Sequence, residues 1–230
     1  MVKKGIAMKL KSLFATGVIV TSAIVLIGCN RGTGRVGDAP RTVSATSDSA
    51  WQEVKSSGIA LQFPSDWKLL DVTTKEFDSV ADKVFGNDPK FESARNQAKA
   101  MAKQGQIKIF AFEPNVTDNF RSNCNVLVKT LPANYTIEQI GEASVAEIRP
   151  FVAAGTQPKL EYTSVDSGKC AIVRSVITAP NPAVPQYVSL GFVFVKGTKI
   201  AVITFSAMLS RESEIRKIAD KAVTKFRFTD

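Results

Sequence analysis

Cysteine and acidic side chains are the groups in this chain that could do chemistry, because the sequence contains three cysteines and no histidine. Without histidine there is no base for Ser-His-Asp or Cys-His catalysis and no imidazole ligand for zinc. Asp78 and Asp82 lie four residues apart near Glu76, but Lys75 and Lys83 surround them, so we interpret this run as a solvated helix face. We therefore expect no enzyme activity, no catalytic residue, no metal site and no cofactor.

Cys124 and Cys170 form an even pair once Cys29 is set apart. In an oxidising compartment they are a candidate disulfide, which would stabilise the fold by about 4 kcal/mol in the chain-entropy model. Two buried free thiols are the alternative, since cysteine is a common core residue. Spacing alone leaves both open, because it does not give the distance between the two Cα atoms.

The residues before Cys29 have the pattern of a targeting segment. Four lysines, all within the first eleven residues, precede an apolar run of fifteen residues, Leu13–Ile27, and no acidic residue occurs before Asp38. This run fits the hydrophobic region of a signal peptide and is shorter than the ~20 residues that span a bilayer. The alternative is an uncleaved membrane helix, against which the abrupt change to Asn30 and Arg31 argues.

The end of that run, Leu26-Ile27-Gly28-Cys29, resembles the lipobox of bacterial lipoproteins. The resemblance implies lipid attachment at Cys29 and signal cleavage between Gly28 and Cys29. Two acyl chains, such as palmitate, anchor a protein stably, whereas one binds a membrane only marginally. We expect a protein anchored to the cell membrane or the outer membrane and facing the periplasm or the extracellular side; Asn30 resembles lipoproteins that are released to an outer membrane.

The positive charge is modest. The net charge of +9 falls to +5 when the four lysines of the signal segment are removed, which does not indicate nucleic-acid binding. Two rows of basic residues could rest on anionic lipid or act as ordinary solubilising side chains. A stiff loop with three prolines, Pro180–Pro185, could contact a protein or serve only as a connector. The two basic rows are Arg95, Lys99 and Lys103, and Lys217, Lys221 and Lys225.

The patterning divides the chain into a signal peptide (1–28), a lipidated N-terminus with a flexible linker (29–50) and one α+β domain (51–230). Period-2 alternation and turn residues predict strands, and capping boxes with apolar stripes predict helices. Because most strands follow each other through short turns, we expect a largely antiparallel sheet sandwiched between helices. The expected strands are 59–63, 67–71, 107–112, 124–131, 159–166, 170–178, 186–195 and 199–207; the expected helices are 73–84, 88–105, 136–151 and 211–224.

Several short motifs together resemble the PsbP-like and DcrB-like domains of bacterial lipoproteins and photosystem accessory proteins. They are Phe63–Trp67, Ser122–Val126, Lys196-Gly197, Thr204–Ala207 and Phe226–Phe228. The sequence departs from that family by an inserted helical segment, 73–105, and by Cys124 in place of an aliphatic residue. The resemblance implies a non-enzymatic binding or assembly factor for an envelope or photosynthetic membrane complex, with another envelope or membrane protein as partner. A carrier of a small apolar or anionic ligand is the alternative.

Overall fold

The structure is a computed structural model, and it describes residues 26–27, 42–45, 50–56, 58–70, 72, 96, 99–100, 102–114, 120–178 and 186–229. None of the helices in this part of the chain is both long and apolar enough to cross a membrane. The expected signal cleavage site and most of the expected helical segment 73–105 lie outside the described residues.

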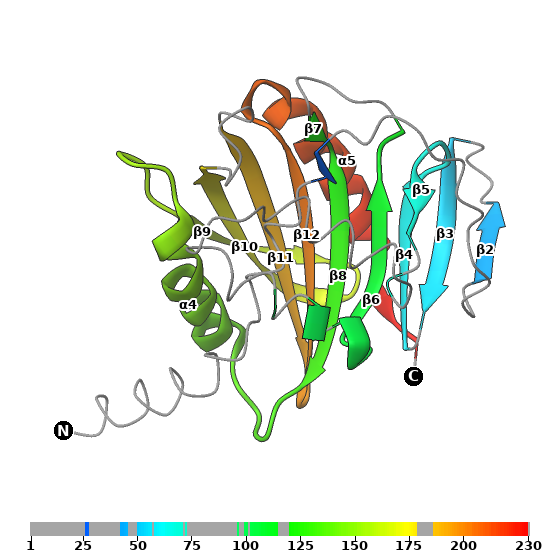
Figure 1. Ribbon diagram of the computed structural model, residues 1–230. Helices are drawn as coiled ribbons and strands as arrows, with labels where there is room; N and C mark the ends of the chain where they lie inside the picture. The colour runs from blue at the N-terminus through cyan, green and yellow to red at the C-terminus, as the bar shows by residue number, and fades with distance from the viewer. Residues whose placement is uncertain are drawn as a thin grey trace.

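A seven-stranded sheet forms the centre of the molecule (Figure 1). All of its neighbouring strands are antiparallel, and hairpins connect β9 to β10 and β11 to β12. In the second hairpin Lys196 pairs with Lys199, and Gly197 adopts a φ of 60°, which favours glycine. The strands in spatial order are β5 (Lys68–Leu69), β6 (Ile107–Phe112), β8 (Asn123–Thr130), β12 (Lys199–Met208), β11 (Tyr187–Lys196), β10 (Gly168–Ile177) and β9 (Lys159–Val165).

Two smaller sheets complete the strand pattern. A four-stranded sheet has the order β13 (Arg227–Phe228), β4 (Ile59–Pro64), β3 (Trp51–Ser56) and β2 (Thr42–Ala45), again antiparallel throughout. The other sheet pairs β1 (Leu26–Ile27) with β7 (Phe120–Arg121). Leu26 and Ile27 belong to the segment that the lipobox resemblance would remove.

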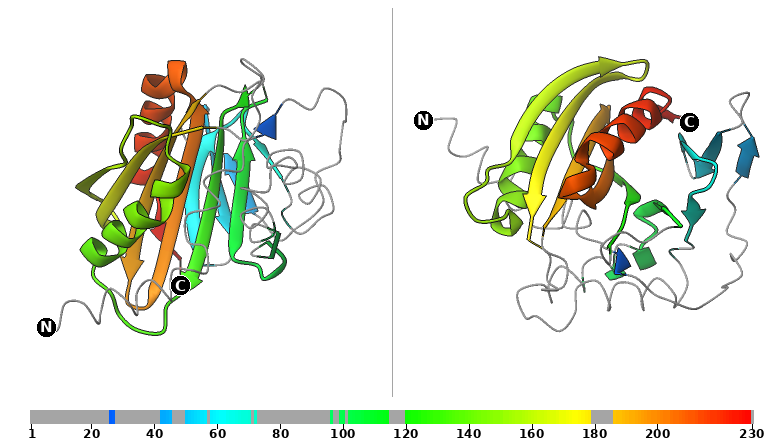
Figure 2. Two further views of the ribbon diagram at one scale, coloured as in Figure 1. Left: turned by 60° about the vertical axis from the view of Figure 1, so that its left-hand side comes forward. Right: turned by 90° about the horizontal axis from the view of Figure 1, so that it is seen from above.

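Two helices cover opposite faces of the large sheet. Helix α4 (Ile137–Ile148) begins with the expected capping box between Thr136 and Gln139 and packs on β9, β10 and β11. The 3-10 turn η2 (Arg149–Phe151) follows it directly. Helix α5 (Glu212–Thr224), preceded by the 3-10 turn η3 (Leu209–Arg211), packs on β4, β11 and β12. Seen from above, the sheet curves between these helices (Figure 2).

The two faces of the sheet have separate hydrophobic cores. Ile140 and Ile148 of α4 belong to one core, with side chains such as Val193 and Val202 of the sheet. Ile215, Ala219 and Val223 of α5 belong to the other, which also contains the inward residues of β3 and β4. Because β11 and β12 are covered on both faces, they are nearly continuous apolar runs rather than alternating ones. The expected α+β class, with an antiparallel sheet between helices, is confirmed.

The N-terminal part contains two strands that we did not expect. Thr42–Ala45, in the segment expected to be a linker, forms β2, and Trp51–Ser56, at the start of the expected domain, forms β3. Thr42 pairs with Lys55, and Val43 pairs with Val54. Thr42–Ala45 is too short a run for its pattern to indicate a strand, and it forms one because it pairs with β3, which the local sequence does not reveal.

Candidate functional site

The sequence-predicted site residues fall into two groups. Gly28 and Cys29 lie outside the described residues, as do Arg95, the carboxylates Asp78 and Asp82, and the proline loop 180–185. Cleavage, lipid attachment and loop contacts therefore stay predictions. The structure describes the remaining residues. It decides between a disulfide and free thiols for Cys124 and Cys170, and it gives the exposure of most residues of the two basic rows.

The candidate disulfide is wrong, because Cys124 and Cys170 are buried free thiols. Strands β12 and β11 lie between β8 and β10, so the cysteine-bearing strands are about 14 Å apart, whereas bridged Cα atoms lie within ~7 Å. The cross-strand row from Cys124 passes through Phe205 and Leu190 and reaches Arg174, not Cys170. Burial raises the pKa of Cys170 to about 12 and that of Cys124 well above its ordinary value. Both are therefore unreactive core thiols.

The expected lysine row of α5 is only partly a free solvated face. Lys221 lies over the Trp51 ring, 4.5 Å from its centroid, which is cation–π distance. Lys217 and Lys225 are exposed. On the other expected row, Lys103 is exposed and Lys99 is half-buried.

The α4-facing side of the sheet carries a cluster of buried polar side chains. In one cross-strand row Ser175 of β10 is opposite Ser189 of β11, which is opposite Ser206 of β12, which is opposite Asn123 of β8. Thr204 and Asn125 form the adjacent pair on the same face, since side chains alternate between faces. All six are at most 3% exposed. We call these residues the polar band: Ser175, Ser189, Ser206, Thr204, Asn123 and Asn125.

Some of these polar atoms have no hydrogen-bond partner in the described part of the chain. They include Ser175 Oγ and Asn123 Oδ1 of the band, Ser144 Oγ on the sheet-facing side of α4 and the neighbouring Tyr187 hydroxyl. An unsatisfied buried hydroxyl or amide costs roughly 1–3 kcal/mol. Such a group either carries this cost in the folded protein or is satisfied by an ordered water.

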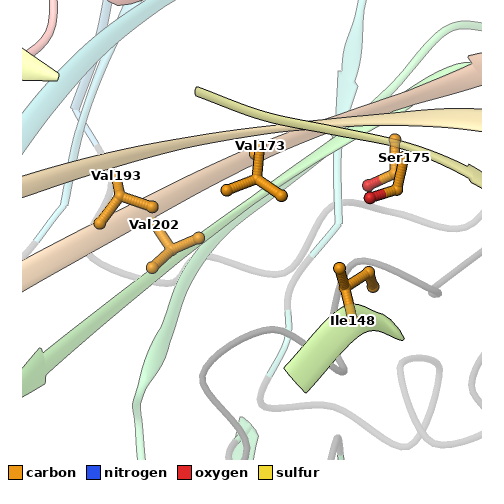
Figure 3. A pocket seen from close by; sticks show the side chains of 7 residues that line it. Ile148, Val173, Ser175, Val193 and Val202 are labelled. Carbon is orange, nitrogen blue, oxygen red and sulfur yellow. The ribbon is translucent and has the colours of Figure 1, made fainter. Parts of the chain in front are cut away.

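A small cavity lies beside the band, between α4 and the sheet (Figure 3). Ile148 of α4 points toward the sheet, and Val173, Val193 and Val202 line the opposite wall. Ser175 and Ser189 supply its polar atoms. Its volume of about 10 Å³ accommodates about one water molecule. The band can therefore hold a water and offers neutral hydrogen-bonding groups, but no charge. Sequence patterns do not reveal the band, because only the strand register brings these residues together.

A second polar cluster joins α5 to the end of β6. Arg211 donates two hydrogen bonds to Glu113, at 2.6 and 3.0 Å, and others to Glu214 at 2.6 and 2.9 Å. Arg211 also donates a hydrogen bond to the Ser122 hydroxyl at 3.2 Å. The hydrogen bonds from Arg211 hold the pKa of Glu214 below its ordinary value, and both carboxylates raise the pKa of Arg211. All five N–H groups of the Arg211 guanidinium donate hydrogen bonds within the cluster, which indicates a structural role. We call Arg211, Glu113, Glu214 and Ser122 the Arg211 clamp.

Generic motif spacings and metal-ligand clusters add no catalytic centre in the described residues. The spacing Ser65-x-x-Lys68 runs from the turn after β4 to the first residue of β5, and both side chains are exposed. The spacing Gly32-x-Gly34-x-x-Gly37 lies outside the described residues. Histidine, cysteine and acidic side chains do not gather into a group of three that could hold a metal ion anywhere in the described ranges.

No family model and no curated protein matches the chain. Solved structures with similar folds include CyanoP, the cyanobacterial PsbP of Synechocystis sp. PCC 6803, at 13% identity, covering 86% of this chain and 98% of that one with a TM-score of 0.45. Mycobacterium tuberculosis LpqN, which is involved in cell envelope biogenesis, matches at 10% identity over 83% and 91% with a TM-score of 0.46. The Ran-binding protein Mog1p of Saccharomyces cerevisiae matches at 11% over 84% and 97% with a TM-score of 0.42.

Proposed function

We propose that the chain is a lipid-anchored, extracytoplasmic binding or assembly protein without enzyme activity, attached to its membrane through Cys29. A basic start, a fifteen-residue apolar run and Leu26–Cys29 support the anchor, since each is found in the order that lipoprotein processing requires. Its partner would be another protein of the envelope or of a photosynthetic membrane.

Within the described residues, the small size of the cavity between α4 and the sheet is the observation that favours binding at the surface over carrying a ligand. Pockets for small molecules measure about 300–1,000 Å³. The cavity between α4 and the sheet measures about 10 Å³, and Val72, Ala102 and Phe110 are buried in the same core. A carrier of a small apolar or anionic ligand is therefore the weaker alternative for the described part of the chain.

The anchor is tested by measuring intact mass and detergent partitioning of the protein made in its own host. We expect a chain that begins at Cys29 with a diacyl or triacyl mass and that partitions into detergent. Cys29→Ala should lose both the added mass and the cleavage. Gly28→Ala keeps a small residue before the cysteine and is the matched control, which should be processed normally. An unlipidated, water-soluble wild-type chain would overturn the proposal.

Binding is tested by crosslinking in the native membrane followed by affinity purification. We expect one envelope or membrane protein to be recovered with the lipidated chain in stoichiometric amounts. Native mass spectrometry of the purified chain addresses the carrier alternative. A small molecule retained in every preparation, without a crosslinked protein, would contradict the binding proposal.

A further inference from the structure

Basic side chains gather at one end of the large sheet. This end contains the β11–β12 hairpin, the start of β6, the end of β8 and the end of α5. Backbone hydrogen bonds join these parts, from Val128 to Gln106 at 2.9 Å and from Leu131 to Thr198 at 2.7 Å. We call the following residues the basic end: Lys55, Lys103, Lys108, Lys129, Lys196, Lys199, Lys225 and Arg227.

The four-stranded sheet contributes to the same end. Ser56, at the end of β3, donates a hydrogen bond to the carbonyl oxygen of Lys108 at 3.2 Å. Lys196 lies 5.7 Å from the centroid of the Phe228 ring on β13. These contacts bring the basic residues of both sheets to the same end of the fold.

Among the described residues, few acidic side chains lie at or next to the basic end. Glu53 pairs with Lys55 at 3.2 Å and with Arg227 at 2.6 Å. At the neighbouring β9–β10 corner, Glu138 pairs with Lys169, and Asp166 is exposed. The basic residues outnumber these acids, so the described part of this end carries a positive excess.

The opposite end of the sheet lacks this imbalance. There Arg174 pairs with Glu212, and Arg211 pairs with Glu113 and Glu214. The charge of the described residues is therefore distributed unevenly along the strands, with positive charge concentrated at one end. A charged surface of this kind attracts a surface of opposite charge over about one Debye length.

The N-terminal chain enters the four-stranded sheet at the same end, although Leu26 and Ile27, which the proposed cleavage removes, pair with β7 at the opposite end. Thr42 of β2 pairs with Lys55 of β3, whereas Ala45 pairs with Gln52 toward the opposite end. The chain therefore enters the fold beside the basic end. The thirteen peptide units between Cys29 and Thr42 span at most about 45 Å in any conformation.

We propose that the basic end lies against anionic lipid headgroups and so orients the anchored domain, with the Arg211 clamp and η3 facing away from the membrane. This inference rests on the proposed lipid anchor at Cys29. Two features support it independently, namely the positive excess and the entry of the chain at that end. The acyl chains hold the protein on the membrane, and a basic surface adds an attraction to anionic headgroups that depends on the orientation of the domain.

The test uses the lipidated chain purified from its host and reconstituted in phosphatidylcholine vesicles with or without phosphatidylglycerol. Amide hydrogen exchange is measured at both ends of the sheet. We expect several-fold slower exchange at Lys196–Lys199 and at the end of α5 in anionic vesicles than in neutral ones. Exchange at Leu209–Arg211 should be the same in both. High salt, which shortens the Debye length to about 3 Å at 1 M, should remove the difference.

Charge reversal locates the effect. The triple variant Lys103→Glu, Lys196→Glu, Lys225→Glu changes exposed residues of the basic end and should abolish the difference between vesicles. A matched triple variant of exposed lysines outside it, Lys68→Glu, Lys159→Glu, Lys217→Glu, changes the net charge equally and should retain it. Thermal unfolding by circular dichroism confirms that both variants are folded.

The outcomes separate the inference from the proposal beneath it. A wild-type chain that floats with neither vesicle overturns both the anchor and the orientation. A chain that floats equally with both vesicles, without any difference in exchange, keeps the anchor and overturns the orientation. An equal loss in the two triple variants would show that only net charge matters, which also overturns the orientation.

Discussion

Gly141 of helix α4 lies so close to Leu160 of strand β9 that an added Cβ would be 3.1 Å from the Leu160 Cδ1 atom. The same Cβ would lie 3.2 Å from Ala171 Cβ and 3.2 Å from the Tyr162 hydroxyl. Glycine therefore permits the close approach of α4 to the sheet, although it weakens a helix interior by about 1 kcal/mol relative to alanine.

Gly141→Ala should thus destabilise the protein, because three tight contacts form at once and Ala171 lies within the sheet. We expect a loss of about 1 kcal/mol in the free energy of unfolding, after the gain in helix propensity. Ala146→Gly on the exposed face of α4 is the control and should cost about 1 kcal/mol through propensity alone. Urea unfolding measures both, and a stabilised Gly141→Ala variant would contradict the close approach.

Arg174 of β10 and Glu212 of α5 form a bidentate ion pair whose second hydrogen bond measures 2.6 Å. The two side chains are 24% and 30% exposed, so solvent screens the pair only in part. The hydrogen bonds from Arg174 hold the pKa of Glu212 below its ordinary value of 4.5. The folded state therefore binds fewer protons than the unfolded state near that pH, and acid favours unfolding.

Stability from this pair should be fully present above about pH 4.5 and should decrease as the pH falls through the lower pKa of the folded state. We expect Glu212→Gln to lose about 1 kcal/mol at pH 7 and much less at an acidic pH below the lowered pKa of the folded state, where the wild-type carboxyl is also protonated. Thermal unfolding at both pH values measures this. Arg174→Met, which keeps an apolar stem, completes a double-mutant cycle; equal losses at both pH values would show that charge is not the cause.

Sequence patterns identified the elements whose signals are local. The Thr136–Gln139 capping box marked the start of α4, and period-2 alternation marked β4. They could not identify β2, whose strand conformation depends on hydrogen bonds to β3, nor exclude the disulfide. The separation of Cys124 from Cys170 depends on β11 and β12 lying between their strands, and strand order is a property of the whole fold. The polar band needs strand order and register together.

The thiols of Cys124 and Cys170 should be present but protected. Both are buried, and burial raises both pKa values, so little reactive thiolate forms near neutral pH. Iodoacetamide at pH 8 should leave both unlabelled in the folded chain and should label both in urea without any reductant. Intact mass reports the number of labels. If labelling in urea requires prior reduction, the two thiols are bridged after all.

Ser175 places an unpartnered hydroxyl next to the cavity between α4 and the sheet. If that hydroxyl is unsatisfied, Ser175→Ala removes its desolvation cost and should raise the free energy of unfolding by about 1 kcal/mol. Thr136→Ala removes a hydroxyl that accepts the Gln139 amide hydrogen bond at 3.2 Å, and it should lower stability by about 1 kcal/mol. The opposite signs test whether hydrogen-bond satisfaction, rather than the hydroxyl itself, decides stability. Urea unfolding measures both variants, and a destabilised Ser175→Ala variant would indicate that a bound water satisfies the hydroxyl in the cavity.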